Sequence, residues 1–150
     1  MLKGLDPRLN AELLFVLRAM GHGDALVLAD ANFPADQVAR HTSYGQLLRM
    51  DNLSAAEAAS AILSVLPLDT FVDDFALRME LVDQPQEIPP VQREVQAEID
   101  RHEGRARPLL SIERFAFYDA ARQAYAVVQT SERRFYGCFL FRKGVIPPDA

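Results

Sequence analysis

The segment from Met20 to Pro34 carries the residues of this chain that are best suited to acid–base chemistry. It places His22 between Gly21 and Gly23, then a short apolar run, then Asp30 in a loop. Glycine tolerates backbone angles that other residues avoid, so the two glycines can present the imidazole at a tight turn. Because histidine titrates near neutral pH, it can both give and take a proton. The segment predicts an exposed general acid or base between a helix and a strand.

His22 and Asp30 flank the apolar run Ala25 to Ala29, which is typical of a short buried strand. A strand advances roughly 3.3 Å per residue, so the two side chains should lie at opposite ends of it. They can share a pocket only if the chain folds back around the strand or if a second subunit brings the two ends together. A helix-capping glycine followed by a loop histidine without a catalytic role is a simpler interpretation that remains open.

Two later segments combine residue types that suit a polar ligand. Arg114 stands among aromatic residues, and its guanidinium offers the several donors that a polyhydroxylated ligand needs. The segment Tyr136 to Cys138 enters a strand with a phenol and a glycine, where backbone groups could bind hydroxyls. Each segment also has an ordinary structural explanation, namely a surface arginine beside core aromatics and a plain strand entry.

Other kinds of site are not supported by the sequence. The three histidines, at positions 22, 41 and 102, show no metal-ligand spacing, so no metal site is predicted. The run Gly21-His22-Gly23 lacks a third glycine and follows a helix, which argues against nucleotide binding. The single cysteine, Cys138, excludes an internal disulfide and suits a reducing compartment, so we expect a cytoplasmic location.

Length and composition favour one domain spanning residues 1 to 150, and the alternation of helices and strands along the chain makes its expected class α/β. The chain is 49% hydrophobic, which is enough for a core of ordinary size. A net charge of −5 argues against a nucleic-acid surface, and the patch Arg101 to Arg107 is too short to change that. We expect neither a membrane span nor export, because the sequence has no long apolar stretch and no signal-peptide pattern.

Apolar spacing and capping signals predict the secondary structure. In the first half, the expected elements are a helix over Asn10 to Met20 with Gly21 as its C-cap, a strand over Ala25 to Ala29, a loop over Asp30 to Gly45, a strand over Gln46 to Met50, and a helix over Ser54 to Leu66. Ser54 and Glu57 form a capping box in front of the last of these.

In the second half, the expected elements are a half-exposed strand over Phe75 to Val82, an outer helix over Val91 to His102 that ends at Gly104, a helix over Ile112 to Ala121, and strands over Tyr125 to Gln129 and Gly137 to Arg142. The last two strands should form a hairpin or near-hairpin. Alternating helices and strands predict helices covering a sheet, and the final pair makes that sheet mixed.

Four segments together resemble one family, the RbsD/FucU sugar mutarotases. They are Met20-Gly21-His22-Gly23-Asp24, Asp30-Ala31-Asn32-Phe33-Pro34, Arg114-Phe115-Ala116-Phe117-Tyr118, and Tyr136-Gly137 followed by Lys143-Gly144-Val145. The resemblance covers nearly the whole chain and is nearer to the fucose branch than to the ribose pyranase branch. It implies a three-layer α/β/α fold and a homo-oligomeric ring of five subunits or a decamer, with pockets near the subunit contacts.

The resemblance also implies roles for particular residues. His22 matches the proton donor, Asp30 and Arg114 match sugar-binding residues, and Tyr136, Gly137 and Cys138 match a Tyr-Gly-Asn segment that binds sugar. Tyr118 could add a stacking face and a hydroxyl. Two departures bear on the sugar preferred: Cys138 replaces the usual asparagine, and Asn32 stands where fucose enzymes often have histidine.

The implied reaction is interconversion of the α and β anomers of a monosaccharide, most simply L-fucose or a related sugar, without metal or cofactor. Two alternatives remain open at this point. One is a ribose-type pyranase, which interconverts pyranose and furanose rings. The other is a non-catalytic sugar-binding or transport-accessory protein that has kept the fold.

Overall fold

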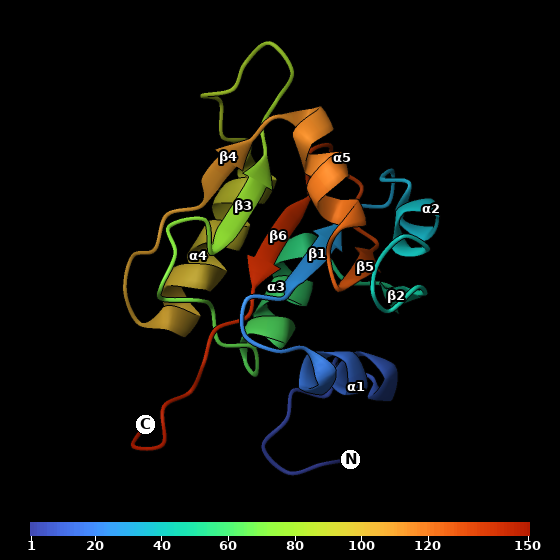
Figure 1. Ribbon diagram of the computed structural model, residues 1–150. Helices are drawn as coiled ribbons and strands as arrows, with labels where there is room; N and C mark the ends of the chain where they lie inside the picture. The colour runs from blue at the N-terminus through green and yellow to red at the C-terminus, as the bar shows by residue number, and fades with distance from the viewer.

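Six short strands form one sheet at the centre of the structure (Figure 1). The computed structural model describes residues 1–150 and orders the strands β2-β5-β1-β6-β3-β4. The strands are β1 (Ala25–Ala29), β2 (Leu47–Met50), β3 (Ala76–Met79), β4 (Leu110–Ile112), β5 (Ala126–Thr130) and β6 (Phe139–Arg142). Only β6 runs antiparallel to its neighbours, β1 and β3. The sheet is therefore mixed, as the sequence predicted.

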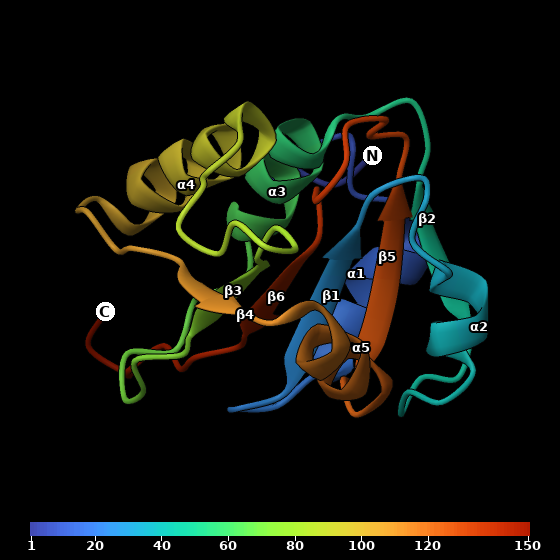
Figure 2. The same cartoon turned by 90° about the horizontal axis from the view of Figure 1, so that it is seen from above.

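Helices cover both faces of the sheet. They are α1 (Ala11–Ala19), α2 (Ala35–Ala39), α3 (Ala55–Leu63), α4 (Pro90–Glu103) and α5 (Arg114–Arg122). Buried residues of α1, α3 and α4 pack on one face of the sheet, and those of α2 and α5 pack on the other. Figure 2 shows α3 and α4 across the sheet from α5. The predicted three-layer α/β/α architecture is confirmed.

The central strand β1 is buried along its whole length. Its side chains alternate between the two cores, with Leu26 and Leu28 in one and Val27 and Ala29 in the other. A strand covered on both faces reads as a continuous apolar run, which is why the sequence identified it. None of the helices is long and apolar enough to span a membrane.

The predicted hairpin between the last two strands is wrong. β5 and β6 both pair with β1, which lies between them, and not with each other. The connecting residues 131–138 pass over the end of β1 and are long enough to leave room for it. A central strand needs hydrogen-bond partners on both edges, and this split arrangement supplies them.

Two short elements were missed by the sequence analysis. The segment Asp30 to Gly45, predicted as a loop, contains α2. With only 5 residues, this helix is too short to show a helical period in the sequence. Strand β4 was not predicted: its last residue, Ile112, was taken as the start of the following helix, but α5 begins only at Arg114. The Glu113 carboxylate accepts from the Phe115 and Ala116 N–H groups and so caps that helix.

Two other details also differ. β3 is buried on both faces rather than half-exposed, because Arg78 is enclosed by carbonyl groups of Pro85 and Glu87 and by Gln92. Helix α1 is capped by Met20, and the left-handed angle falls at Gly23 (φ 84°) rather than at Gly21.

Candidate functional site

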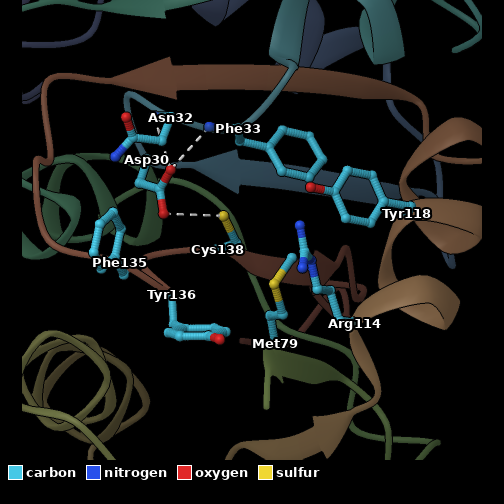
Figure 3. Close-up of a pocket in the computed structure, with 9 residues that line it drawn as sticks. All are labelled: Asp30, Asn32, Phe33, Met79, Arg114, Tyr118, Phe135, Tyr136 and Cys138. Atoms are coloured by element: carbon cyan, nitrogen blue, oxygen red, sulfur yellow. Dashed lines mark hydrogen bonds between the residues drawn. The ribbon is translucent and has the colours of Figure 1, made fainter. Parts of the chain in front are cut away.

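A cavity of about 300 Å³ opens at one end of the central strands of the sheet (Figure 3). It lies where β1 and β3 end and β6 begins, since β6 runs antiparallel to both. The lining residues are Asp30, Asn32, Phe33, Met79, Arg114, Tyr118, Phe135, Tyr136 and Cys138. In α/β sheets, ligands commonly bind in the crevice outside the carboxyl ends of parallel strands. The cavity is at the small end of the range for ligand sites, which suits a small molecule.

Asp30 holds the two loops of the cavity together. Its side chain is almost completely buried, at 4% exposure. Oδ1 accepts from the backbone N–H groups of Asn32 and Phe33, both at 3.0 Å. Oδ2 accepts from the Gly137 N–H at 3.1 Å and from the Cys138 thiol at 3.5 Å. A carboxylate has about four acceptor positions, so a ligand hydroxyl that bonds Asp30 must share an oxygen with one of these donors.

The sequence suggested that backbone groups of the segment Tyr136 to Cys138 could bind ligand hydroxyls, but the Gly137 N–H does not fit that role. Gly137 is buried and its N–H is bonded to Asp30, so that group is not free for a ligand. Cys138 is buried as well. Burial, together with the nearby charge of Asp30, raises the pKa of the Cys138 thiol, which is therefore the neutral donor to Asp30.

Helix α5 supplies the cation and the aromatic face of the cavity. Arg114, in its first turn, is exposed and has no ion-pair partner in the chain, so its guanidinium donors are free for a ligand. Figure 3 shows this group reaching into the space between Tyr118 and Cys138. The Tyr118 ring stacks on Phe33, with centroids 5.1 Å apart. Arg114 and Tyr118 therefore both line the cavity.

Tyr136 has a backbone conformation that is uncommon for a residue other than glycine, with φ of 63°. Its carbonyl accepts from the Gln92 side chain at 3.0 Å, and its hydroxyl accepts from the Val82 N–H at 3.4 Å. Gln92 also donates to the Met79 carbonyl at 2.7 Å and so ties together two residues that line the cavity.

His22 lies at the opposite end of β1 from this cavity, as the strand geometry predicted. It precedes β1, and the Gly23 N–H beside it donates to the carbonyl of Lys143, which follows β6. The imidazole is 46% exposed, its Nε2 is 3.1 Å from Asp69 Oδ2, and its ring packs edge-on against Phe71. Within one chain, then, the structure brings together Asp30, Arg114, Tyr118, Tyr136 and Cys138, but not His22.

Asp69 was not found from the sequence. Burial raises its pKa, but hydrogen bonds from the Phe71 N–H and from His22 outweigh this effect and leave the pKa of Asp69 below its ordinary value. An ionised carboxylate orients the imidazole and favours the tautomer in which Nε2 carries the proton. Asp69 stands 47 positions from His22 in the chain, so no local pattern could have linked them.

Three other residues of the cavity, Phe33, Met79 and Phe135, were also not singled out. Met79 ends β3, and its place beside Asp30 depends on strand order. Phe135 lies in the long connection before β6, and its 73% exposure, which the sequence does not show, marks it out only in the structure.

Comparison with known proteins agrees with this architecture. A model of the RbsD / FucU transport protein family matches residues 3–146. The chain belongs to the RbsD / FucU family. It is 44% identical to the fucose mutarotase of Homo sapiens over 97% of this chain and 94% of that protein.

Solved structures extend the similarity. A crystal structure described as a proposed sugar binding protein is 60% identical with a TM-score of 0.96, over 98% of this chain and 97% of the other. The fucose mutarotase of Streptococcus pneumoniae, solved in complex with L-fucose, is 33% identical with a TM-score of 0.86, over 97% of this chain and all of the other (100%). The family resemblance predicted from the four sequence segments is confirmed.

Proposed function

We propose that this protein is a sugar mutarotase that interconverts the α and β anomers of L-fucose or a closely related monosaccharide. The observation that carries the proposal is the 44% identity, over nearly full length, to a named fucose mutarotase. The cavity supports it, because Arg114 offers several free donors and Tyr118 and Tyr136 offer aromatic faces with hydroxyls. Such a lining suits a small ligand that presents several hydroxyl groups.

Anomer exchange is an acid–base reaction. A base removes the proton from the anomeric hydroxyl while an acid protonates the ring oxygen, so the ring C–O bond breaks and the open-chain aldehyde forms. Rotation about the C1–C2 bond and re-closure on the other carbonyl face then give the opposite anomer. The oxidation state of the carbon does not change, so the chemistry needs no redox cofactor.

In this proposal His22 is the proton donor, and its conjugate base acts on re-closure. The proposal is supported by the exposure of the imidazole and by its contact with the Asp69 carboxylate, which orients the ring. The sugar is bound by Arg114, Tyr118, Tyr136 and Cys138. Asp30 keeps the two loops in place, and one of its oxygens accepts a hydrogen bond from a sugar hydroxyl in addition to those from the protein.

We further propose that the active site is shared between subunits of a ring, either a pentamer or a pair of pentamers. His22 and the cavity lie at opposite ends of β1, so a neighbouring chain must supply the second half of each active site. Large apolar side chains are exposed near both groups. Phe71, beside His22, is 71% exposed, and Phe135, which lines the cavity, is 73% exposed. Exposed apolar groups of this kind are typical of contact surfaces.

The proposal also places residues 1–150 in one mutarotase domain that acts in the cytoplasm. Neither a membrane nor a nucleic acid is proposed as a binding partner. The family match over residues 3–146 and the single sheet support one domain. A lone free thiol, Cys138, is compatible with a reducing compartment.

Saturation-transfer NMR on equilibrated sugars tests the function. We expect magnetisation to pass between the α and β anomeric protons of L-fucose faster than in the uncatalysed sample. Exchange between pyranose and furanose signals of ribose, without anomer exchange in fucose, would instead indicate a pyranase. Binding without any accelerated exchange would indicate the accessory role and would contradict the proposal.

The Arg114→Ala variant is expected to bind the sugar about 10- to 100-fold more weakly, because charge-assisted hydrogen bonds to hydroxyls are lost. Titration calorimetry or ligand-observed NMR measures this affinity. Arg122→Ala is the matched control, since Arg122 ends the same helix, is exposed and lies outside the cavity. Unchanged affinity in the Arg114 variant would assign that side chain to the surface alone.

A further inference from the structure

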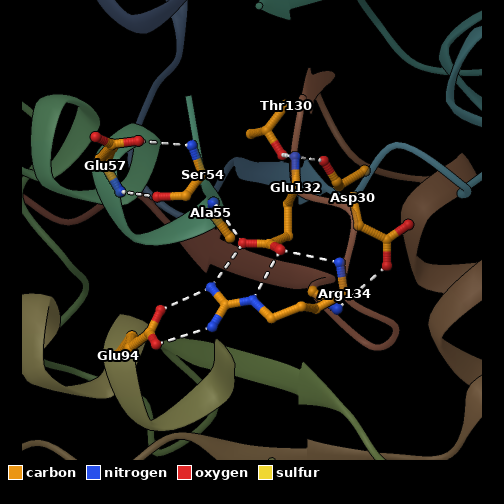
Figure 4. Close-up of polar contacts among 10 residues, drawn as sticks. Asp30, Ser54, Ala55, Glu57, Glu94, Thr130, Glu132 and Arg134 are labelled. Atoms are coloured by element: carbon orange, nitrogen blue, oxygen red, sulfur yellow. Dashed lines mark hydrogen bonds and ion pairs between the residues drawn. The ribbon is translucent and has the colours of Figure 1, made fainter. Parts of the chain in front are cut away.

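Glu132 is a buried carboxylate that contacts residues around the cavity but does not line it. Figure 4 shows its polar contacts. It follows β5 in the connection that carries Phe135, Tyr136, Gly137 and Cys138. Only 4% of its surface is exposed. The mechanism described above does not use it, so its burial calls for a different explanation.

The carboxylate of Glu132 is fully bonded. Oε1 accepts from the Arg134 backbone N–H and from Arg134 Nε, both at 2.9 Å. Oε2 accepts from Arg134 Nη2 at 2.9 Å and from the Ala55 N–H, in the first turn of α3, at 3.2 Å. Hydrogen bonds from Arg134 are the main reason why the pKa of Glu132 is lowered to about 2, so it is ionised at neutral pH.

Arg134 continues the network to another helix. Its Nη1 and Nη2 donate to the two oxygens of Glu94, on α4, at 2.8 and 2.7 Å. The guanidinium therefore bridges two carboxylates in fixed, forked geometry. In this way the loop after β5 is attached at once to α3 and to α4.

Glu132 also contacts both loops that form the cavity. Its carbonyl accepts from the Ala31 N–H at 2.8 Å, next to Asp30. Its side chain packs against Gly137 so closely that a Cβ at that position would be 2.9 Å from Glu132 Cγ and 3.3 Å from Asp30 Cβ. A shift of Glu132 would therefore move the Asp30 loop and the Tyr136 loop together.

We propose that Glu132, held by Arg134, is a positioning residue that sets the placement of the sugar-binding loop from Phe135 to Cys138. This inference rests on the proposed function for the nature of the ligand. The same loop is tied independently to α4 by Gln92, which bonds the Tyr136 carbonyl. Loss of the Glu132 attachment therefore displaces the loop without releasing it.

The test compares Glu132→Gln and Arg134→Lys with the wild-type chain. The glutamine of the first variant would turn an NH₂ group toward the Arg134 donors, and the lysine of the second keeps the charge but lacks the fork. We expect KM for anomer exchange to rise about 10-fold in each variant while kcat falls far less, because the loop binds the sugar and His22 lies elsewhere. Exchange rates measured over a range of sugar concentrations separate the two constants.

Glu57→Gln is the matched control. Glu57 caps the same end of α3, accepting from the Ser54 N–H at 2.8 Å, but it does not touch the loop (Figure 4). This variant should lose stability in a thermal melt and keep the wild-type KM. An unchanged KM in folded Arg134→Lys and Glu132→Gln, or an equal rise in Glu57→Gln, would overturn the inference; if Glu132→Gln does not fold, Arg134→Lys decides. Absence of exchange in the wild type would instead refute the proposed function.

Discussion

The His22→Gln variant is expected to lose catalysed anomer exchange by about 10²- to 10⁴-fold while remaining folded, which is the usual cost of removing a general acid–base group. Glutamine keeps a polar side chain that can still reach the Asp69 carboxylate, but it cannot supply a proton near neutral pH. Because the imidazole is exposed and stands outside both buried clusters, its replacement should change the core very little.

Saturation-transfer NMR at saturating sugar measures this loss, and circular dichroism confirms the fold. His41→Gln is the control, since His41 is exposed in the turn after α2 and contributes nothing to the cavity. That variant should exchange like the wild type. Near-normal exchange by a folded His22→Gln protein would remove His22 from the mechanism.

Two variants that are each impaired in exchange are expected to restore activity when they assemble together. One is His22→Gln, and the other is the double variant Arg114→Ala/Tyr136→Phe, which keeps His22 but has a defective cavity. If each site takes His22 from one subunit and the cavity from its neighbour, mixed rings contain intact sites. With equal amounts and random assembly, half of the histidines and half of the cavities are intact, so about one quarter of the sites recover.

Co-expression with two different tags and sequential purification gives the mixed oligomers, and light scattering gives their size. Activity is measured at a sugar concentration below KM, where the defective cavity has its largest effect. Co-expression of two differently tagged His22→Gln chains is the control and should stay inactive. Mixed samples no more active than their parents, or a fully active wild-type monomer, would contradict the shared site.

Local sequence determined the parts of this fold that depend on neighbouring residues. Ser54 and Glu57 form the predicted capping box at the start of α3, because the bonds join residues three apart. The continuous apolar run of β1 was identified because both of its faces are covered. The separation of His22 from Asp30 followed from the rise of a strand alone, and it led to the hypothesis of a shared site.

Tertiary structure decided how distant segments meet. The position of β1 between β5 and β6 could not be predicted from the connection that joins those two strands. It depends on which strands supply hydrogen-bond partners to the two sides of β1. The partners of the site residues followed from that strand order. Asp69 meets His22 at one end of the strands, and Asp30 meets Gly137 at the other, only because the fold brings together chain segments that are far apart in sequence. Buried polar groups then bond the partners that lie beside them.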